Sequence, residues 1–303
     1  MHDLVIIGAG PAGLTAAVYA RRAGKTVAVL EKASFGGQIT HSPKIENYPG
    51  FTEISGAELA DRMTEQALFQ GAEIELETVT GIEVRNGAFC VVTEDSSFPC
   101  KSVIIAAGAE PRRLGVMRED TLSGRGIYYC AVCDGAFQRG RTAGIVGGGN
   151  SALQEALLLA DIVKKLYVIQ NLDFFTGEEQ MVQALRARDN VEILLGTVVE
   201  ALIGEDELRA VRVRSNSGEE KTIDLEALFV AIGRVPANEA FSGYAGLDPA
   251  GYIDAGEDCL TKTPGIFVAG DCRRKSVRQL ATAISDGAVA ALAACRYIDA
   301  LKQ

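Results

Sequence analysis

Residues Leu4-Val5-Ile6-Ile7-Gly8-Ala9-Gly10-Pro11-Ala12-Gly13 decide the fold. The four apolar residues predict a buried strand, and the alanine-rich stretch after the glycines predicts a helix. Gly8, Gly10 and Gly13 have the spacing of a turn that joins such a strand to a helix and lets a pyrophosphate approach the backbone. Glu31 ends the next predicted strand, 18 residues after Gly13, where a carboxylate meets an adenosine ribose. Together these features favour a dinucleotide site over a glycine turn that only packs.

The plan of strand, glycine turn and helix occurs a second time, at 143–146 and 147–160. Each copy also ends alike, with an apolar run that reaches a glycine, Gly108 or Gly233, and then a proline. The stretch 265–303 fits neither copy alone and indicates a return to the first domain. We therefore predict an α/β protein with two Rossmann-like, three-layer dinucleotide-binding domains, the second inserted into the first.

The predicted first domain comprises residues 1–112 and 241–303, and the predicted second domain comprises residues 113–240. The chain crosses between them near Pro111 and Pro236. A helical pattern from about Leu280 to Leu301 closes the first domain.

Composition limits the classes of partner. The chain has 303 residues, with 40 Asp and Glu against 30 Lys and Arg, and a formal net charge of −10. A negative surface repels phosphate backbones and anionic lipid, so we expect no nucleic acid and no membrane as partner. No signal peptide or membrane span is visible in the sequence. Seven cysteines, an odd number, favour a reducing compartment, so we expect a cytoplasmic protein.

Cys130-Ala131-Val132-Cys133 has the spacing of a redox-active dithiol. Two intervening residues let the sulfurs close a small ring, and a helix N-terminus favours the reactive thiolate. Zinc would need two further ligands, but no second such motif exists and the chain's histidines are His2 and His41, so we expect no metal. Two buried structural thiols are the other alternative. Asp134 follows directly, where a carboxyl group exchanges protons with a thiolate or caps the helix.

Over its whole length the chain resembles the low-molecular-weight thioredoxin reductases. The motifs that carry the resemblance are the first glycine turn with Glu31, Gly36-Gly37-Gln38, Glu46-Asn47-Tyr48-Pro49-Gly50, Cys130 to Gly135, and Ala269-Gly270-Asp271 with Arg278-Gln279. The resemblance implies that the first domain binds FAD, with Asp271 on the ribityl chain and Gln279 near the isoalloxazine. Taken alone, the glycine pair at 36–37 is also compatible with an ordinary loop, and Asp271 with a helix cap.

The residues expected to bind FAD, from the glycine fingerprint and the resemblance together, are Gly8, Gly10, Pro11, Ala12, Gly13, Glu31, Lys32, Gly36, Gly37, Gln38, Asn47, Gly108, Gly270, Asp271, Arg278, Gln279 and Leu280. The resemblance further implies catalytic roles for three residues. Cys133 faces the flavin, Cys130 attacks the disulfide of thioredoxin or a thioredoxin-like protein, and Asp134 is the acid and base. It also implies a homodimer.

The second glycine turn, at Gly147, Gly149 and Ala152, normally serves NADPH. In the family, a His-Arg-Arg segment with a further arginine follows the next strand and binds the 2′-phosphate. Here residues 166–169 run into Gln170-Asn171-Leu172-Asp173-Phe174-Phe175-Thr176-Gly177, and no Lys or Arg occurs from 166 to 177. A 2′-phosphate needs such cationic partners, and an NAD site usually presents an acid at the strand tip, which is absent here. The pair Phe174-Phe175 predicts core or interface packing.

In this respect the sequence resembles anaerobe relatives of the family that take electrons from ferredoxin at the flavin. We therefore expect ferredoxin as the donor, ahead of NADH and then NADPH. Ferredoxins are usually acidic, so docking requires a locally basic patch on this acidic chain. The first candidate is Arg273-Arg274-Lys275 with Arg278, and the second is Arg112, Arg113 and Arg118. An ordinary solvated basic loop is the alternative to either.

Two other functions stay open on the sequence. One is a flavin disulfide oxidoreductase with a different acceptor, and the other is a flavin-binding redox sensor that uses the two thiols as a switch.

Overall fold

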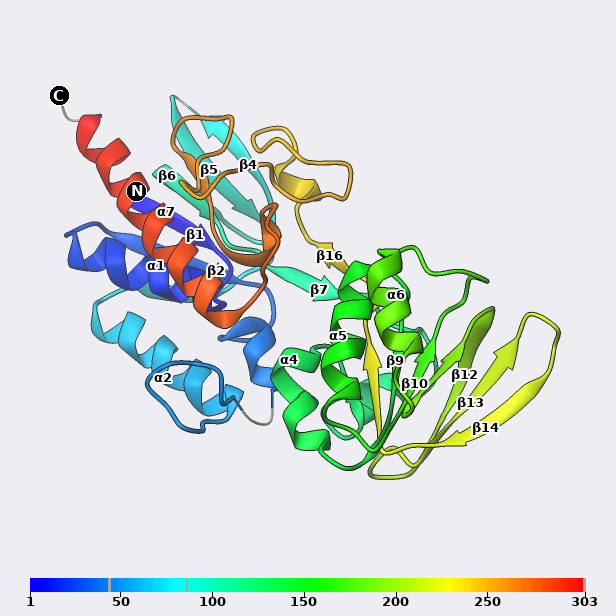
Figure 1. Cartoon of the computed structure of the whole chain (residues 1–303). Helices are drawn as coiled ribbons and strands as arrows, with labels where there is room; N and C mark the ends of the chain where they lie inside the picture. The colour runs from blue at the N-terminus through cyan, green and yellow to red at the C-terminus, as the bar shows by residue number, and fades with distance from the viewer. Residues whose placement is uncertain (43–44, 86, 302–303) are drawn as a thin grey trace. The chain divides into compact units, whose positions relative to one another are not determined.

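The computed structural model describes residues 1–42, 45–85 and 87–301 (Figure 1). The chain divides into two compact units, Met1–Glu110 with Val235–Gln303 (unit 1) and Pro111–Arg234 (unit 2). It leaves unit 1 in β7 (Ala109–Pro111) and returns in β16 (Arg234–Pro236), and these two short strands pair with each other. Unit 2 is therefore an insertion into the sequence of unit 1.

Unit 1 is built on a sheet of order β3-β2-β1-β6-β5-β4, with β17 also paired to β6. The strands are β1 (His2–Ile7), β2 (Val27–Glu31), β3 (Glu73–Leu76), β4 (Val79–Arg85), β5 (Ala88–Thr93), β6 (Ser97–Ile105) and β17 (Ile266–Val268). Pairing is parallel from β3 to β6 and between β6 and β17, and antiparallel where β5 joins β6 and β4. The carboxyl ends of β1, β2, β6 and β17 thus meet at one edge.

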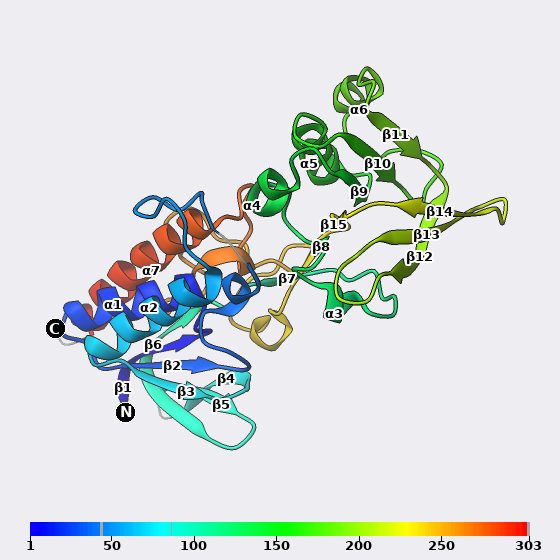
Figure 2. The same ribbon diagram turned by 90° about the horizontal axis from the view of Figure 1, so that it is seen from below.

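The helices of unit 1 explain why its sequence is rich in alanine. The helical segments are α1 (Pro11–Arg22), α2 (Gly56–Phe69), α7 (Leu280–Ala300) and the short η1 (Gly37–His41), η3 (Glu239–Phe241) and η4 (Gly270–Cys272). In both ribbon views α1 and α7 lie side by side (Figure 1 and Figure 2). A Cβ on Gly287 would lie 2.2 Å from the carbonyl oxygen of Ala12, so the two helix backbones touch.

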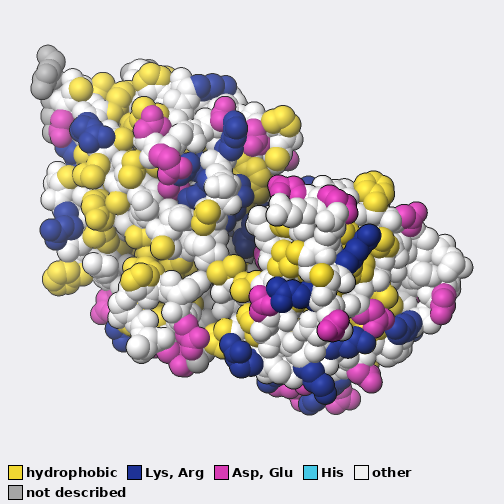
Figure 3. All heavy atoms as spheres, viewed as in Figure 1, with side chains coloured by type: hydrophobic (Ala, Val, Ile, Leu, Met, Phe, Trp, Pro, Cys, Tyr) yellow, Lys and Arg dark blue, Asp and Glu magenta, His cyan; other side chains and the backbone are white. Residues whose placement is uncertain are grey.

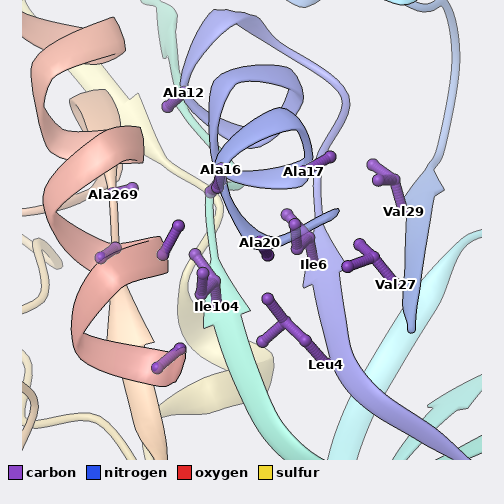
Figure 4. Packing of buried hydrophobic residues seen from close by; sticks show 14 of the residues in the cluster. Leu4, Ile6, Ala12, Ala16, Ala17, Ala20, Val27, Val29, Ile104 and Ala269 are labelled. Atoms are coloured by element: carbon purple, nitrogen blue, oxygen red, sulfur yellow. The ribbon is translucent and has the colours of Figure 1, made fainter. Parts of the chain in front are cut away.

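Both faces of the central strands of unit 1 are buried. Leu4 and Ile6 of β1 and Ile104 of β6 pack against the alanines of α1, as Figure 4 shows. Their neighbours Val5 and Ile7 face the opposite way, into a second apolar cluster. Burial on both faces is why these strands are continuous apolar runs in the sequence.

Unit 2 repeats the plan with a parallel sheet of order β11-β10-β9-β15-β8. Its strands are β8 (Ile127–Tyr128), β9 (Thr142–Val146), β10 (Lys165–Ile169), β11 (Val191–Leu194) and β15 (Ala227–Val230). Its helices are α3 (Glu119–Leu122), α4 (Ala131–Asp134), α5 (Asn150–Ala160), α6 (Glu179–Arg186) and the short η2 (Gly135–Gln138). An antiparallel sheet completes it: β12 (Thr197–Ile203), β13 (Ala210–Ser215) and β14 (Glu220–Asp224).

The predicted fold class, two Rossmann-like domains with the second inserted into the first, is confirmed. In each unit a parallel strand, a glycine turn and a helix follow one another. Among the described residues, no helix is long and apolar enough to cross a membrane. The same part of the chain contains no cluster of three or more His, Cys, Asp or Glu side chains arranged to hold a metal ion.

Candidate active site

The first glycine turn has the backbone geometry that a pyrophosphate site requires. Gly8 has φ 105°, which favours glycine, and a Cβ on Gly13 would lie 1.9 Å from the carbonyl oxygen of Gly8. By contrast, a Cβ on Gly10 would meet no atom within 4 Å. Gly8 and Gly13 are therefore required by packing, whereas Gly10 borders open space at the N-terminus of α1.

Glu31 lies beside this turn at the carboxyl end of β2. It is 8% exposed, its Oε2 accepts a hydrogen bond from Ala9 N–H (2.8 Å), and its Oε1 accepts one from Ala33 N–H (3.0 Å). A pocket of about 100 Å³ opens here, lined by Gly8, Glu31 and Lys32 among others. The described residues therefore fit the adenosine half of a dinucleotide such as FAD.

The loop at Gly36 and Gly37 is fixed against the same turn. Gly36 N–H donates to the carbonyl oxygen of Ala9 (2.8 Å), and a Cβ on Gly37 would lie 3.2 Å from Cα of Gly10. Gln38 follows in η1. Both glycines have positive φ, at 100° and 57°, so the tight approach explains the glycine pair.

The other residues expected at the flavin lie near the start of α7 or at the edge of the sheet. Asn47 Nδ2 donates to Gln279 Oε1 (3.3 Å), so two residues far apart in sequence meet. Gln279 caps α7, which Leu280 begins, and Asp271 lies in η4. Arg278 Nε donates to the Asp271 carbonyl oxygen (3.4 Å).

Three further residues expected at the cofactor, Gly108, Gly270 and Lys32, lie elsewhere in unit 1. Gly108 and Gly270 occupy positive φ, at 69° and 81°, shortly after the ends of β6 and β17. Lys32 forms an exposed ion pair with Glu110 (2.8 Å). The structure thus brings all predicted cofactor residues into unit 1.

The first basic patch predicted for ferredoxin docking is wrong. Arg273 is 1% exposed and the Lys275 side chain 5%, because both cations pair with the buried carboxylate of Asp286. Arg274 is exposed but pairs with Asp254 (3.2 Å), and the Arg278 guanidinium lies 4.1 Å from the ring centre of Tyr252. The segment is a structural clamp rather than a free cationic surface.

In unit 2, Cys130 and Cys133 form a disulfide. Cys130 caps the short helix α4, and Cys133 N–H donates to its Sγ (3.2 Å). Both cysteines are partly exposed, and Val132 between them is 53% exposed. This segment is therefore not enclosed in the core of unit 2.

The other cysteines differ from this pair in burial. Cys90, Cys100, Cys259, Cys272 and Cys295 are buried and free. Burial raises the pKa of the Cys100, Cys259 and Cys272 thiols to about 12. Since the thiolate is the reactive form, they are inert at neutral pH.

Asp134 is buried beside the disulfide, with 7% of its surface exposed. Burial, followed by the charge of Glu155, raises its pKa to about 7. Its Oδ1 accepts no hydrogen bond from the described residues. A carboxyl group with this pKa can both give and take a proton at neutral pH.

Sequence reasoning missed Glu155. Its Oε2 accepts a hydrogen bond from the N–H of Ala131, the residue directly after Cys130 (2.9 Å). The available signal was its position on α5, on the face that also carries the buried Ala152 and Leu159. An acid on an apolar face indicates a polar partner.

The second glycine turn is covered by the loop that follows β10. The carbonyl oxygen of Gly148 accepts hydrogen bonds from Thr176 N–H (2.9 Å) and Gly177 N–H (3.0 Å). Asn150, the first residue of α5, forms two hydrogen bonds with Glu178. The Glu178 N–H donates to Asn150 Oδ1 (2.7 Å), and Asn150 Nδ2 donates to Glu178 Oε1 (3.1 Å). A carboxylate therefore lies at the helix N-terminus where a pyrophosphate would bind.

The two phenylalanines of that loop behave differently. Phe175 packs against the apolar core of unit 2, as expected. Phe174 is 61% exposed, and its carbonyl oxygen accepts a hydrogen bond from Nε2 of the buried Gln170 (3.2 Å).

Comparisons with known proteins agree over the whole chain. The family model described as pyridine nucleotide-disulphide oxidoreductase matches residues 2–287. A 34.2 kDa protein in the rubredoxin operon of Clostridium pasteurianum is 41% identical over 98% of this chain and 97% of its own length. The thioredoxin reductase of Mycolicibacterium smegmatis is 38% identical over 98% of this chain and 97% of its own length.

Solved structures give the same answer. The crystal structure of thioredoxin reductase from Streptococcus pyogenes matches with a TM-score of 0.93 at 38% identity, covering 99% of both chains. Thioredoxin reductase from Giardia duodenalis matches with a TM-score of 0.90 at 33% identity, over 98% of this chain and 99% of that one. The expected cofactor, FAD, is confirmed by this relationship. The chain belongs to the pyridine nucleotide-disulphide oxidoreductases and, within them, to the FAD-dependent disulfide oxidoreductases of the thioredoxin reductase type.

Proposed function

We propose that the chain reduces the disulfide of thioredoxin through Cys130 and Cys133, and that ferredoxin supplies the electrons. The observation that carries the proposal is the partly exposed Cys130–Cys133 disulfide with the buried Asp134 beside it. Residues 1–112 and 241–303 act as the FAD domain, and residues 113–240 carry the dithiol. When bound to the FAD domain, FAD would supply the two electrons that reduce the Cys130–Cys133 bond.

The geometry around the sulfurs favours Cys130 as the thiol that attacks the acceptor. The N–H of Cys133 points at Cys130 Sγ and stabilises negative charge there once the disulfide is reduced. Cys130 then forms a mixed disulfide with the acceptor, and Cys133 resolves it. Asp134 exchanges protons with the leaving thiolates.

Two features of unit 2 support a donor other than a pyridine nucleotide. Residues 166–177 contain no Lys or Arg to bind a 2′-phosphate. In addition, Glu178 lies against Asn150 at the start of α5, so its negative charge opposes a pyrophosphate at that helix N-terminus. Both features weaken NADPH binding, and the second also weakens NADH binding.

With Arg273 and Lys275 buried, the proposed ferredoxin contact moves to unit 2. Arg112, Arg113 and Arg118 are exposed there. Arg113 Nη1 donates to Tyr129 Oη (2.6 Å), next to Cys130, and also pairs with the exposed Asp120 (3.2 Å). Arg118 Nη2 donates to the Glu205 carbonyl oxygen (2.6 Å). On the face shown in Figure 3, acidic and basic side chains are interspersed. This arginine group therefore offers local positive charge on an acidic chain.

The proposal includes a homodimer, as the resemblance implies, and a location in the cytoplasm, as the odd number of cysteines favours. Light scattering of the FAD-loaded chain tests the dimer, for which a mass near twice 32.1 kDa is expected. A mass of one chain at micromolar concentration would contradict it.

The donor experiment mixes the oxidised FAD-loaded chain anaerobically with NADPH, NADH or reduced ferredoxin and follows flavin absorbance. We expect rapid bleaching by ferredoxin and slow bleaching by both nucleotides. Rapid bleaching by micromolar NADPH would overturn the donor assignment without affecting the acceptor. Oxidised thioredoxin is then added to the reduced enzyme. Failure to reduce it, with turnover of another disulfide, would overturn the acceptor assignment.

A further inference from the structure

A second carboxylate lies at the dithiol. Glu155 Oε2 accepts the Ala131 N–H, and Ala131 is the buried first residue of α4, between the two cysteines. A Cβ on Gly135 would lie 3.2 Å from Leu159 of α5, so the turn after Asp134 also packs closely on the helix that carries Glu155. The dithiol segment therefore rests on α5, and Glu155 provides its polar contact there.

The two carboxyl groups interact electrostatically, and their surroundings differ. Burial raises the pKa of Glu155, but the Ala131 N–H and the charge of Arg234 act in the opposite direction. Asp134 has a buried Oδ1 without a hydrogen bond from the described residues. Of two carboxyl groups that repel each other when both are charged, the one whose charge is less stabilised by hydrogen bonds binds a proton more readily, so we expect the proton on Asp134 and the charge on Glu155.

The other ionisable groups around Asp134 and Glu155 do not change which of the two carboxyl groups binds the proton more readily. Tyr128 of β8 interacts electrostatically with Asp134, and burial raises the pKa of the Tyr128 phenol, so the phenol stays neutral at pH 7. Arg141 acts on Tyr128, and Arg234 acts on Glu155. Neither arginine is among the groups that shift Asp134, for which burial and Glu155 are the causes.

We propose that Glu155 is a positioning residue of the dithiol site, which orients the Cys130–Cys133 segment through Ala131 and whose negative charge keeps a proton on Asp134. This inference rests on the proposed function and adds a residue to its machinery. Glu155 acts through the Ala131 N–H and through Asp134.

The proton held by Asp134 is the one that the first acceptor thiolate needs during thiol–disulfide exchange. The Cys130 thiolate attacks the acceptor disulfide, and the first acceptor thiolate to leave takes the proton of Asp134. Asp134 regains a proton from the Cys133 thiol as Cys133 attacks Cys130 Sγ. It then protonates the second acceptor thiolate. The acceptor is reduced to two thiols, Cys130 and Cys133 return to the disulfide, and Asp134 recovers its proton from solvent.

The two parts of the proposal are separated by two variants in the FAD-loaded full chain. Glu155→Gln removes the charge but keeps an oxygen that can accept the Ala131 N–H, whereas Glu155→Ala removes both. Gln154→Ala, at the exposed neighbouring position on α5, is the matched control. Asp134→Asn identifies the infrared band of the protonated Asp134 carboxyl group by its loss.

The readouts do not depend on turnover. We expect the Asp134 band to titrate about one pH unit lower in both Glu155 variants than in the unmodified chain or Gln154→Ala. Amide hydrogen exchange at Ala131 should accelerate at least tenfold in Glu155→Ala and remain slow in Glu155→Gln. An unchanged Asp134 titration in both variants would overturn the charge role. Unchanged exchange at Ala131 in Glu155→Ala would overturn the positioning role.

Turnover then separates this proposal from the proposed function. At pH 7, a titration lower by one unit reduces the protonated fraction of Asp134, and hence thioredoxin reduction, about fivefold in Glu155→Gln, with recovery near pH 6. Wild-type protein that fails to reduce thioredoxin would contradict the proposed function, yet the infrared and exchange results would still stand. Loss of activity in Glu155→Gln without a shift of the pH profile would contradict the role of Glu155 alone.

Discussion

Arg273 and Asp286 form a two-point ion pair in the interior of unit 1, with Nε–Oδ2 and Nη2–Oδ1 distances of 2.8 and 2.9 Å. The same Asp286 carboxylate accepts Lys275 Nζ (2.8 Å) and the N–H of Gly270 (3.0 Å). One buried anion on α7 therefore holds two cations and the backbone next to Asp271. Its loss would leave the cations buried and uncompensated, which is costly.

Replacing Asp286 by alanine should destabilise the protein by about 3 to 5 kcal/mol, the usual effect of breaking a buried ion pair. It should also lower retention of FAD, because the segment with Asp271 loses its anchor. Denaturant unfolding and the flavin-to-protein absorbance ratio measure the two effects. Asp254→Ala breaks the exposed pair with Arg274 and should cost less than about 1 kcal/mol. Equal effects of the two substitutions would refute the clamp.

Gly10→Ala and Gly13→Ala should separate cofactor binding from folding. The added Cβ at position 13 would lie 1.9 Å from the Gly8 carbonyl oxygen, so this variant should lose both stability and FAD. At position 10 the Cβ enters open space, so the FAD-free protein should keep its stability within about 1 kcal/mol while FAD affinity falls at least tenfold. Thermal unfolding of the FAD-free variants and FAD titration check this. Normal FAD affinity in Gly10→Ala would place the pyrophosphate elsewhere.

Cys130→Ser and Cys133→Ser should each abolish reduction of thioredoxin while FAD stays bound. Either change removes one sulfur of the disulfide, and the cofactor residues lie in the other unit. Turnover assays and the flavin spectrum provide the test. Cys295→Ala, at a buried free cysteine of α7, is the control and should keep turnover. Full activity in either serine variant would eliminate the dithiol assignment.

Asp134 should make stability depend on pH. Its pKa is about 7 in the folded protein against an ordinary value of 3.8. Between these values the unfolded chain releases the proton that the folded protein keeps, so stability falls as pH rises from 4 to 7. The accumulated cost above pH 7 is at most about 4 kcal/mol.

Asp134→Asn removes this ionisation, so at pH 8 it should be more stable than the unmodified chain, with a flatter profile between pH 4 and 7. Urea unfolding across that pH range, monitored in the oxidised protein, measures the difference. Equal slopes for both proteins would show that Asp134 ionises normally in the folded state.

The repeated glycine turns predicted the architecture because their geometry is local. Gly8, Gly13 and the spaced Glu31 each meet a requirement of the strand–turn–helix unit itself, so the residues alone indicate it. The predicted helix from Leu280 to Leu301 likewise matches α7, Leu280–Ala300. Such features depend on neighbours in sequence rather than on partners brought together by folding.

The sequence was less informative about residues whose role depends on a contact with a residue far away in the sequence. Arg273 and Lys275 looked like surface cations because a basic run is usually solvated, but Asp286 of α7 neutralises them in the interior. Glu155 carried no motif, since its role arises only where α4 packs on α5. The antiparallel sheet β12 to β14 was also not predicted, because its strands carry no chemical motif.

The insertion of unit 2 has a consequence for how the chain folds during synthesis. Residues 111–234 are contiguous, so unit 2 can complete its sheet as soon as it has left the ribosome. Unit 1 cannot complete its fold until synthesis is nearly finished, because β6 pairs with β17 and α1 packs against α7. Both β17 and α7 lie near the end of the sequence. Until then the apolar faces of β1, β6 and α1 stay exposed. The nascent FAD unit is therefore the part of this protein most in need of a chaperone.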